Sequence, residues 1–234
     1  MKITIELRRW LLMATMVLAA PMFSTCAVNS QANAGILDYD DVIGQDVTFT
    51  NLVETSTLGG ELYGQPFADD GDLISSGSGF LAQSAGGGIQ LVDGRLQLTV
   101  TADTGFVFDE ISVETLGSYF GIGADALAVA NSFLTIESDG QFFTAGGTVT
   151  ENGSGSVGWQ DDYSITFPKT DQVTLTLNTQ LLLASGLTSA AFIDSSSIRI
   201  GVNAFATSVP EPSSVGWIAI VMLAIVRHRH RTAA

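Results

Sequence analysis

The chain has 234 residues and a formal net charge of −15, because 24 Asp and Glu residues outnumber 9 Lys and Arg residues. This acidic balance excludes nucleic-acid binding through phosphate neutralisation. Between residues 35 and 208 there are 22 acids, three bases and neither histidine nor cysteine. Disulfides, cysteine-ligated zinc and the Ser-His-Asp and Cys-His catalytic arrangements are therefore excluded there.

The first 34 residues predict a secretory signal peptide. Three cations within the first nine residues precede the apolar stretch LLMATMVLAAPMF, and Ala32-Asn33-Ala34 supplies an A-x-A cleavage site. Cys26 offers lipoprotein processing as an alternative, but the tripeptide FST before it lacks the aliphatic and small residues of a lipobox. We therefore expect export by the Sec machinery and cleavage after Ala34.

Residues 35–203 predict one acidic domain built from β-strands. Apolar and polar residues alternate, as in half-buried strands, over 47–53, 95–101, 173–178 and 197–202. The alanine-rich segment 124–131 could form a helix, but its alternation favours a strand. About nine short strands separated by turn signals predict a single antiparallel β-sandwich of jelly-roll-like class. The signal peptide and a C-terminal hydrophobic helix flank this domain.

Two Asp-Gly dipeptides predict hairpin turns, because this pair suits the type I′ turn. Asp93-Gly94 is expected to join residues 89–92 to the strand that follows the dipeptide. Asp139-Gly140 is expected to join the strands on either side of it. Both hairpins fit an all-antiparallel domain.

The acidic loop region holds the main candidate metal site. Residues 54–79 are rich in Gly, Ser and Asp and are expected to be loop, with a short strand near 61–63. Within this loop Asp69, Asp70 and Asp72 surround a glycine, so three carboxylates can converge on a calcium ion. The alternative is that they are solvated turn residues. The same two interpretations apply to two further groups: Asp38, Asp40 and Asp41, and Asp161 with Asp162.

Trp159 is the single tryptophan between the two terminal segments. It predicts either a platform on which a sugar ring stacks or a core residue of a strand. Glycoside hydrolysis by two carboxylates is a further alternative, but no pair stands out among 22 acids. Because histidine is absent and arginine is scarce, few groups could polarise a substrate, and we expect no enzyme.

Residues 204–208 are assigned to a linker, and a three-part C-terminal segment follows. It runs Val209-Pro210-Glu211-Pro212, then an uncharged and mostly apolar stretch over 213–226, then Arg227, Arg229 and Arg231. The prolines hold the first part extended. The apolar run 215–226 makes a helix of about 18 Å, which is short for a hydrocarbon core of about 30 Å. The arginines favour a cytoplasmic C-terminus.

This order of motif, hydrophobic helix and arginine cluster resembles the PEP-CTERM sorting signal of bacterial exported proteins, here assigned to residues 209–234. The resemblance implies an exosortase-like processing enzyme, transient membrane anchoring through helix 213–226, and association with exopolysaccharide or a biofilm matrix. We therefore expect a non-enzymatic exported protein of the cell surface or extracellular matrix, without a cofactor other than calcium. The alternative is a carbohydrate- or calcium-binding β-sandwich module.

Overall fold

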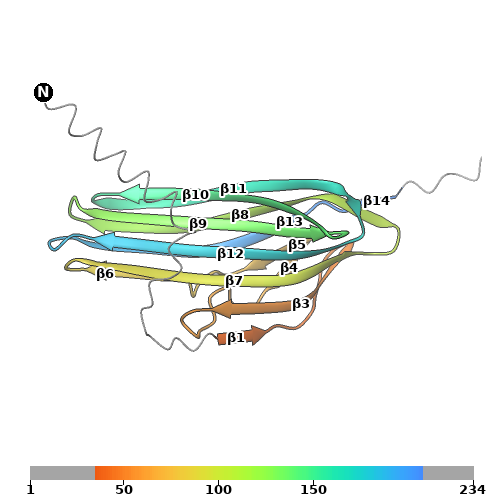
Figure 1. Cartoon of the computed structure of the whole chain (residues 1–234), viewed down its shortest axis with the longest axis horizontal. Coiled ribbons are helices and arrows are strands. Elements are labelled where there is room, and N and C mark those ends of the chain that lie inside the picture. The colour runs from red at the N-terminus through yellow and green to blue at the C-terminus, as the bar shows by residue number, and fades with distance from the viewer. Residues whose placement is uncertain (1–34, 208–234) are drawn as a thin grey trace, which may run out of the picture. The chain divides into compact units, whose positions relative to one another are not determined.

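The computed structural model describes residues 35–207, which form two antiparallel sheets and no helix (Figure 1). Sheet A has the order β1-β3-β7-β12-β9-β10, with β2 beside β3. Its strands are β1 (Gly35–Asp38), β2 (Val42–Ile43), β3 (Val47–Ser56), β7 (Gly88–Ala102), β9 (Ala126–Ser138), β10 (Gln141–Asn152) and β12 (Gln172–Ser185). Residues 35–207 therefore contain no helix that is long and apolar enough to cross a membrane.

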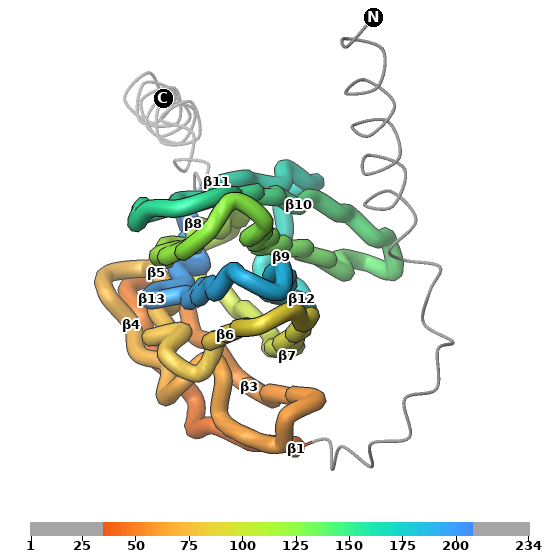
Figure 2. Tube along the Cα trace, turned by 90° about the vertical axis from the view of Figure 1, so that its left-hand side faces the viewer, coloured from red at the N-terminus to blue at the C-terminus, as the bar shows by residue number. Residues whose placement is uncertain are grey.

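Sheet B has the order β11-β8-β13-β5-β4, with β14 beside β8 and β6 beside β13. Its strands are β4 (Phe67–Asp69), β5 (Asp72–Ser75), β6 (Leu81–Ala85), β8 (Phe106–Ile122), β11 (Gly155–Thr170), β13 (Ala190–Val202) and β14 (Phe205–Ala206). Figure 2 shows the two sheets end-on as two layers. The all-β, antiparallel prediction is confirmed.

The core lies between the sheets and follows from the alternation of each strand. In β7, Leu96, Leu98 and Val100 point inward and are buried, whereas Arg95 and Gln97 point outward. The same alternation in the neighbouring strands supplies Phe49, Phe108, Leu134, Leu175, Leu177 and Ile200 to one buried cluster. Burial of this apolar surface is the main contribution that holds the two layers together.

Several predicted elements are confirmed. The four alternating segments lie in β3, β7, β12 and β13, and the alanine-rich segment belongs mostly to strand β9. Asp139 and Gly140 form the two-residue turn between β9 and β10, with φ angles of 51° and 73°. Both positive angles are those that a type I′ turn requires.

The turn predicted at Asp93-Gly94 is wrong. Both residues lie inside β7, where Asp93 pairs with Gln180 and Gly94 pairs with Thr179 of β12. A Cβ atom at Gly94 would lie 2.8 Å from both Leu62 Cδ1 and Phe80 Cζ. The glycine is therefore needed for close packing in the core and not for a turn.

The loop predicted over 54–79 is also corrected. Strand β3 continues to Ser56, and β4 and β5 form a hairpin inside the segment, whereas the strand expected near 61–63 is absent from the described chain. The residues assigned to the linker include β14, in which Phe205 pairs with Val107 of β8. Lys169 Nζ lies 4.6 Å from the centre of the Phe205 ring.

A β-bulge in β3 reverses which side chains face the core. The pairing with β7 shifts between Thr50 and Val53, and Asn51 takes a φ of 54°. The extra residue of a bulge changes the side of the sheet to which later residues point. As a result Glu54, which simple alternation would place outside, points into the core and is 1% exposed.

Candidate functional site

Several predicted residues lie outside the described residues 35–207. They are the cleavage site residues Ala32 and Ala34, the motif Val209, Pro210, Glu211 and Pro212, the helix 213–226, and the cluster Arg227, Arg229 and Arg231. The signal peptide and the sorting segment therefore stay predictions from the sequence.

The candidate calcium residues lie in and beside the β4–β5 hairpin. Asp69 pairs with Asp72 across the hairpin, and Asp70 is in the turn with a φ of 55°. The carboxylate of Asp72 is occupied, because it forms an ion pair with Arg199 and accepts a hydrogen bond from the Val202 amide at 3.3 Å. Among residues 35–207 no group of three carboxylate, His or Cys side chains is placed to hold a metal ion. Calcium binding stays a prediction.

Trp159 lies in the core of the sandwich. It is 5% exposed and its ring lies against Gly117 of β8. The ring face is covered, so it offers no platform for a sugar. Of the two interpretations given by the sequence, a core residue of a strand is the one that fits this position.

Asp161, of the candidate pair Asp161 and Asp162, lies two residues after Trp159 in β11. Burial raises the pKa of the Asp161 carboxyl, and the neighbouring Asp162 raises it further.

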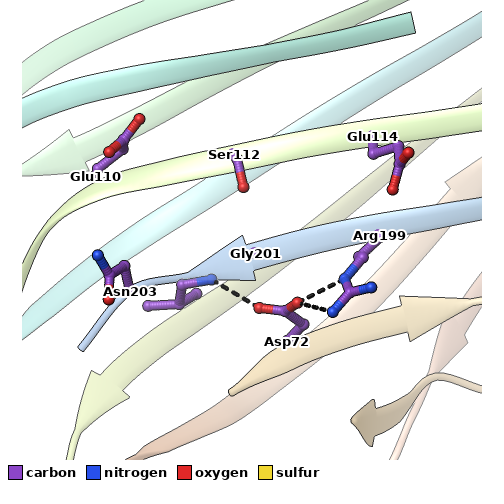
Figure 3. A pocket seen from close by; sticks show the side chains of 8 residues that line it. Asp72, Glu110, Ser112, Glu114, Arg199, Gly201 and Asn203 are labelled. Carbon is purple, nitrogen blue, oxygen red and sulfur yellow. Dashed lines mark hydrogen bonds and ion pairs between the residues drawn. The ribbon is translucent and has the colours of Figure 1, made fainter. Parts of the chain in front are cut away.

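The outer face of sheet B carries a hollow of about 450 Å³ with an acidic lining (Figure 3). Glu110 and Glu114 project from β8, and Arg199 of β13 donates from Nε to Asp72 Oδ2 at 2.5 Å. This hydrogen bond raises the pKa of the Arg199 guanidinium. Because its one cation is paired with Asp72 and two glutamates lie beside it, this hollow is acidic as a whole.

The outer face of sheet A carries two adjoining hollows that share Arg95 and Asn178. One of about 350 Å³ is lined by Arg95, Gln97, Thr135, Glu137, Phe142, Thr174, Thr176 and Asn178. The other, of about 250 Å³, is lined by Thr55, Ser56, Thr57, Asp93, Gly94, Arg95, Asn178 and Gln180. Together the two hollows, which we call the sheet A site, extend across five strands.

Strand register explains why these side chains gather. Arg95 of β7, Asn178 of β12 and Phe133 of β9 are direct neighbours in one row across the sheet. The next row contains Gln97, Thr176 and Thr135, together with Thr144 of β10. Each row therefore presents hydroxyl, amide or guanidinium groups at strand spacing of about 4.8 Å.

Arg95 has no carboxylate partner within the described chain, in which the one ion pair is that of Arg199. Its Nη2 donates a hydrogen bond to Gln97 Oε1 at 3.1 Å. A guanidinium has five N–H donors, so most of its donors stay available in the centre of the sheet A site. Phe142, at the margin, is 67% exposed, and Phe133 is 46% exposed.

A buried polar network supports the sheet A site from below. The Tyr63 hydroxyl donates to the Leu177 and Gly94 carbonyls at 3.1 and 3.2 Å, which joins β12 and β7 beside Asn178 and Arg95. Burial raises the pKa of Tyr63 far above its usual value, so the donor stays protonated.

Glu54 fixes the position of Tyr63. The Glu54 carboxylate accepts hydrogen bonds from the Leu62 amide at 2.6 Å, the Tyr63 amide at 3.1 Å and the Tyr39 hydroxyl at 2.5 Å. A buried carboxylate is tolerated when several donors satisfy it. The loop that carries Tyr63 is thereby held against the inner side of sheet A.

The sheet A site does not follow from any one segment of the sequence. Alternation over 95–101 predicts one polar side of this strand, which Arg95, Gln97, Thr99 and Thr101 share. A usable signal was present in the matching polar series Thr174, Thr176 and Asn178 of β12. The pairing of β7 with β12, two strands about 80 residues apart in the sequence, brings the two series together.

No family model and no curated protein matches this chain. Among solved structures, TmCBM61 in complex with beta-1,4-galactotriose is 12% identical over 53% of this chain and 88% of its own, with a TM-score of 0.22. The family 22 carbohydrate binding module of Clostridium thermocellum Xyn10B is 12% identical over 56% and 89%, with a TM-score of 0.22.

The naturally occurring empty particle of cowpea mosaic virus gives a similar result, at 12% identity over 55% of this chain and 85% of its own, with a TM-score of 0.27. At TM-scores of this size the likeness carries no argument about the fold or the ligand of this chain. The functional argument therefore depends on the residues of the chain itself.

Proposed function

We propose that this protein is a non-enzymatic, exported carbohydrate-binding protein whose ligand lies on the sheet A site. The observation that carries the proposal is the pair of adjoining hollows that share Arg95 and Asn178. Amide, hydroxyl and guanidinium groups supply donors and acceptors side by side, which the hydroxyl groups of a sugar require. The exposed ring of Phe142 offers an apolar surface against which the C–H face of a sugar can pack.

The charge of the domain favours a neutral polysaccharide over a polyanion. Residues 35–208 carry 22 acids and three bases, so the domain repels polymers of uronic acids at low ionic strength. Along β7, β9 and β12 the outward side chains include one cation, Arg95, and two acids, Asp93 and Glu137. The sheet A site is thus close to neutral within an acidic domain.

Export and sorting are supported by the two terminal segments. The signal peptide motif ending at Ala34 and the Pro210-Glu211-Pro212 segment with its basic cluster favour Sec export and processing by an exosortase-like enzyme. In this proposal the described residues form a jelly-roll-like sandwich that is displayed in, or released to, an exopolysaccharide matrix. A shallow surface site suits such a structural role, since no enclosed cleft is needed to exclude water.

Affinity electrophoresis of the exported protein tests the binding proposal. Mobility is compared in native gels that contain soluble galactan, xylan, mixed-linkage glucan, dextran or a polyuronate. The test variant is Arg95→Ala combined with Asn178→Ala. The matched control is Arg199→Ala, which removes the same charge from the outer face of sheet B.

We expect at least one neutral polysaccharide to retard the wild-type protein and the Arg199→Ala control. The Arg95→Ala/Asn178→Ala variant should bind at least tenfold more weakly, which corresponds to about 1.4 kcal/mol. Equal loss in the control, or no retardation of the wild-type protein by any of these polymers, would overturn the proposal.

A further inference from the structure

One end of the sandwich has very few charged residues. The strand ends and loops over 81–92, 116–128, 150–160 and 181–194, which we call the apolar end, contain three acids and neither Lys nor Arg. The remaining described residues contain the other 19 acids and all three cations. Charge is therefore distributed unevenly along the strand direction, which is horizontal in Figure 1.

The four loops of the apolar end are in contact with one another. The Gly86 amide donates to the Ser189 carbonyl at 3.1 Å, and the Gly186 amide donates to the Asp125 carbonyl at 3.0 Å. The Gly153 amide donates to the Ala126 carbonyl at 2.9 Å. These bonds join both sheets into one continuous end surface.

Large exposed hydrophobic side chains gather at the apolar end. It holds eight of the 14 such side chains of the described chain. The most exposed are Leu187 at 85%, Ile89 at 78% and Ile122 at 54%. The Tyr and Trp residues in these segments, Tyr119 and Trp159, are buried. A gathering of exposed apolar side chains on an acidic protein marks an interaction surface.

We propose that the apolar end binds the apolar end of a second copy of this chain, in a two-fold symmetric dimer. Two acidic domains can approach closely only where carboxylates are sparse. The opposite end of the sandwich carries Asp46, Asp70, Asp103 and Asp171 on loops that hydrogen-bond to one another or to adjoining strands. End-to-end contact keeps these carboxylates as far apart as the fold allows.

The chemistry of the apolar end disfavours a membrane as its occupant. Segments that insert at a membrane surface combine apolar residues with Lys or Arg, and with exposed Trp or Tyr near the headgroups. The apolar end has no cation, and its Trp and Tyr are buried. A second copy offers a surface of the same apolar, charge-poor kind.

The last described residue lies at the end of the sandwich opposite the apolar end. The Thr207 amide donates to the Gly105 carbonyl at 2.8 Å, so the described chain ends beside the loop between β7 and β8, at the acidic end. Gln97 and Glu137 of the sheet A site also lie nearer that end along their strands. The dimer therefore leaves the sheet A site of each copy open.

In-cell cross-linking of the full chain tests this inference. In a Cys26→Ser background, Thr188→Cys places a thiol on the exposed loop of the apolar end, and Asp103→Cys places one on the exposed loop of the acidic end. We expect mild oxidation to give a disulfide-linked dimer at least tenfold more efficiently with Thr188→Cys. Equal yields from the two variants would overturn the proposal.

Sedimentation of the purified full chain, in the same mild detergent throughout, gives an independent measurement. We expect Leu187→Asp/Ile89→Asp to weaken self-association at least tenfold. Ile43→Asp/Phe67→Asp, which replaces two exposed apolar residues near the acidic end, should leave it unchanged. A monomeric wild-type protein, equal loss in both variants, or flotation with phosphatidylcholine vesicles that Leu187→Asp abolishes would each contradict the dimer.

Discussion

The dipeptides Asp93-Gly94 and Asp139-Gly140 are identical in sequence and opposite in structure. Asp139 and Gly140 both have positive φ angles and reverse the chain between β9 and β10. Asp93 and Gly94 continue β7 in register with β12 on one side, and Gly94 also pairs with Ser56 of β3 on the other. The same local signal thus produces a turn once and an uninterrupted strand once.

The difference lies in what each glycine does. A Cβ atom at Gly140 would meet nothing within 4 Å, so this glycine serves only the backbone conformation. A Cβ atom at Gly94 would collide with Leu62 and Phe80, which are both buried. Gly140 is required by its backbone dihedral angle. Gly94 is required because side chains from a distant loop pack against it.

The continuity of β7 through Asp93-Gly94 also builds the sheet A site. Because the strand does not turn there, Asp93, Arg95 and Gln97 all project from one side of sheet A. Both hollows include residues of this strand. A hairpin at Asp93-Gly94 would have removed Arg95 from its place beside Asn178.

The largest expected effect belongs to Gly94→Val. Its added methyl groups must displace Leu62 and Phe80 from a packed core, which lowers the free energy of unfolding by about 3 kcal/mol. Denaturant unfolding followed by far-UV circular dichroism measures the loss. Gly60→Val is the control, because a Cβ atom at Gly60 meets nothing within 4 Å. A loss at Gly94 no larger than at Gly60 would refute the packing explanation.

Gly140→Ala should have a smaller effect of about 1 kcal/mol. An L-residue pays a conformational cost in the left-handed region, whereas open space around Gly140 adds no collision. Gly140→Asn should recover much of the loss, since asparagine tolerates this conformation. The same Asn substitution at Gly94 should recover nothing. If Asn recovered the same free energy of unfolding at Gly94 as at Gly140, the two glycines would not have the different roles proposed here.

Asp139→Ala is expected to lower the free energy of unfolding by about 0.5–1 kcal/mol, because Asp139 has a φ of 51° and alanine lacks the local hydrogen bonding that favours this region. Asp139→Asn should be close to neutral. Thermal unfolding of the three proteins at one pH provides the comparison. If alanine is as stable as aspartate here, the turn does not depend on its first residue.

The sequence predicts those parts of the fold that depend on nearby residues. Alternation over 95–101 and 173–178 identifies β7 and β12, and Asp139-Gly140 identifies a hairpin. It does not predict that Gly94 receives Phe80, or that the bulge at Asn51 turns Glu54 inward, because both follow from contacts made after the chain has folded. The sequence also does not predict whether Trp159 is exposed or buried, because exposed and buried positions alternate along β11 and the sequence does not fix which side faces the core.

The sheet A site cannot be predicted from the sequence for a related reason. Its residues come from β3, β7, β9, β10 and β12, whose order across the sheet differs from their order along the chain. Each strand alone shows an ordinary polar side. Only strand order and register place the outward residues of β7 beside those of β12 and make a candidate binding surface from separate polar series.

Asp93→Ala should have the smallest effect on stability and a distinct effect on binding. The Thr57 hydroxyl donates to Asp93 Oδ1 at 2.7 Å in an exposed position, so its loss lowers the free energy of unfolding by only about 0.5 kcal/mol. Because Asp93 lines the smaller hollow, retention on the neutral polysaccharide should fall about fivefold. Asp93→Asn keeps an acceptor for Thr57 and should restore most of that retention. Loss of retention in Asp139→Ala as large as in Asp93→Ala would show that the dipeptide inside the strand has no special part in binding.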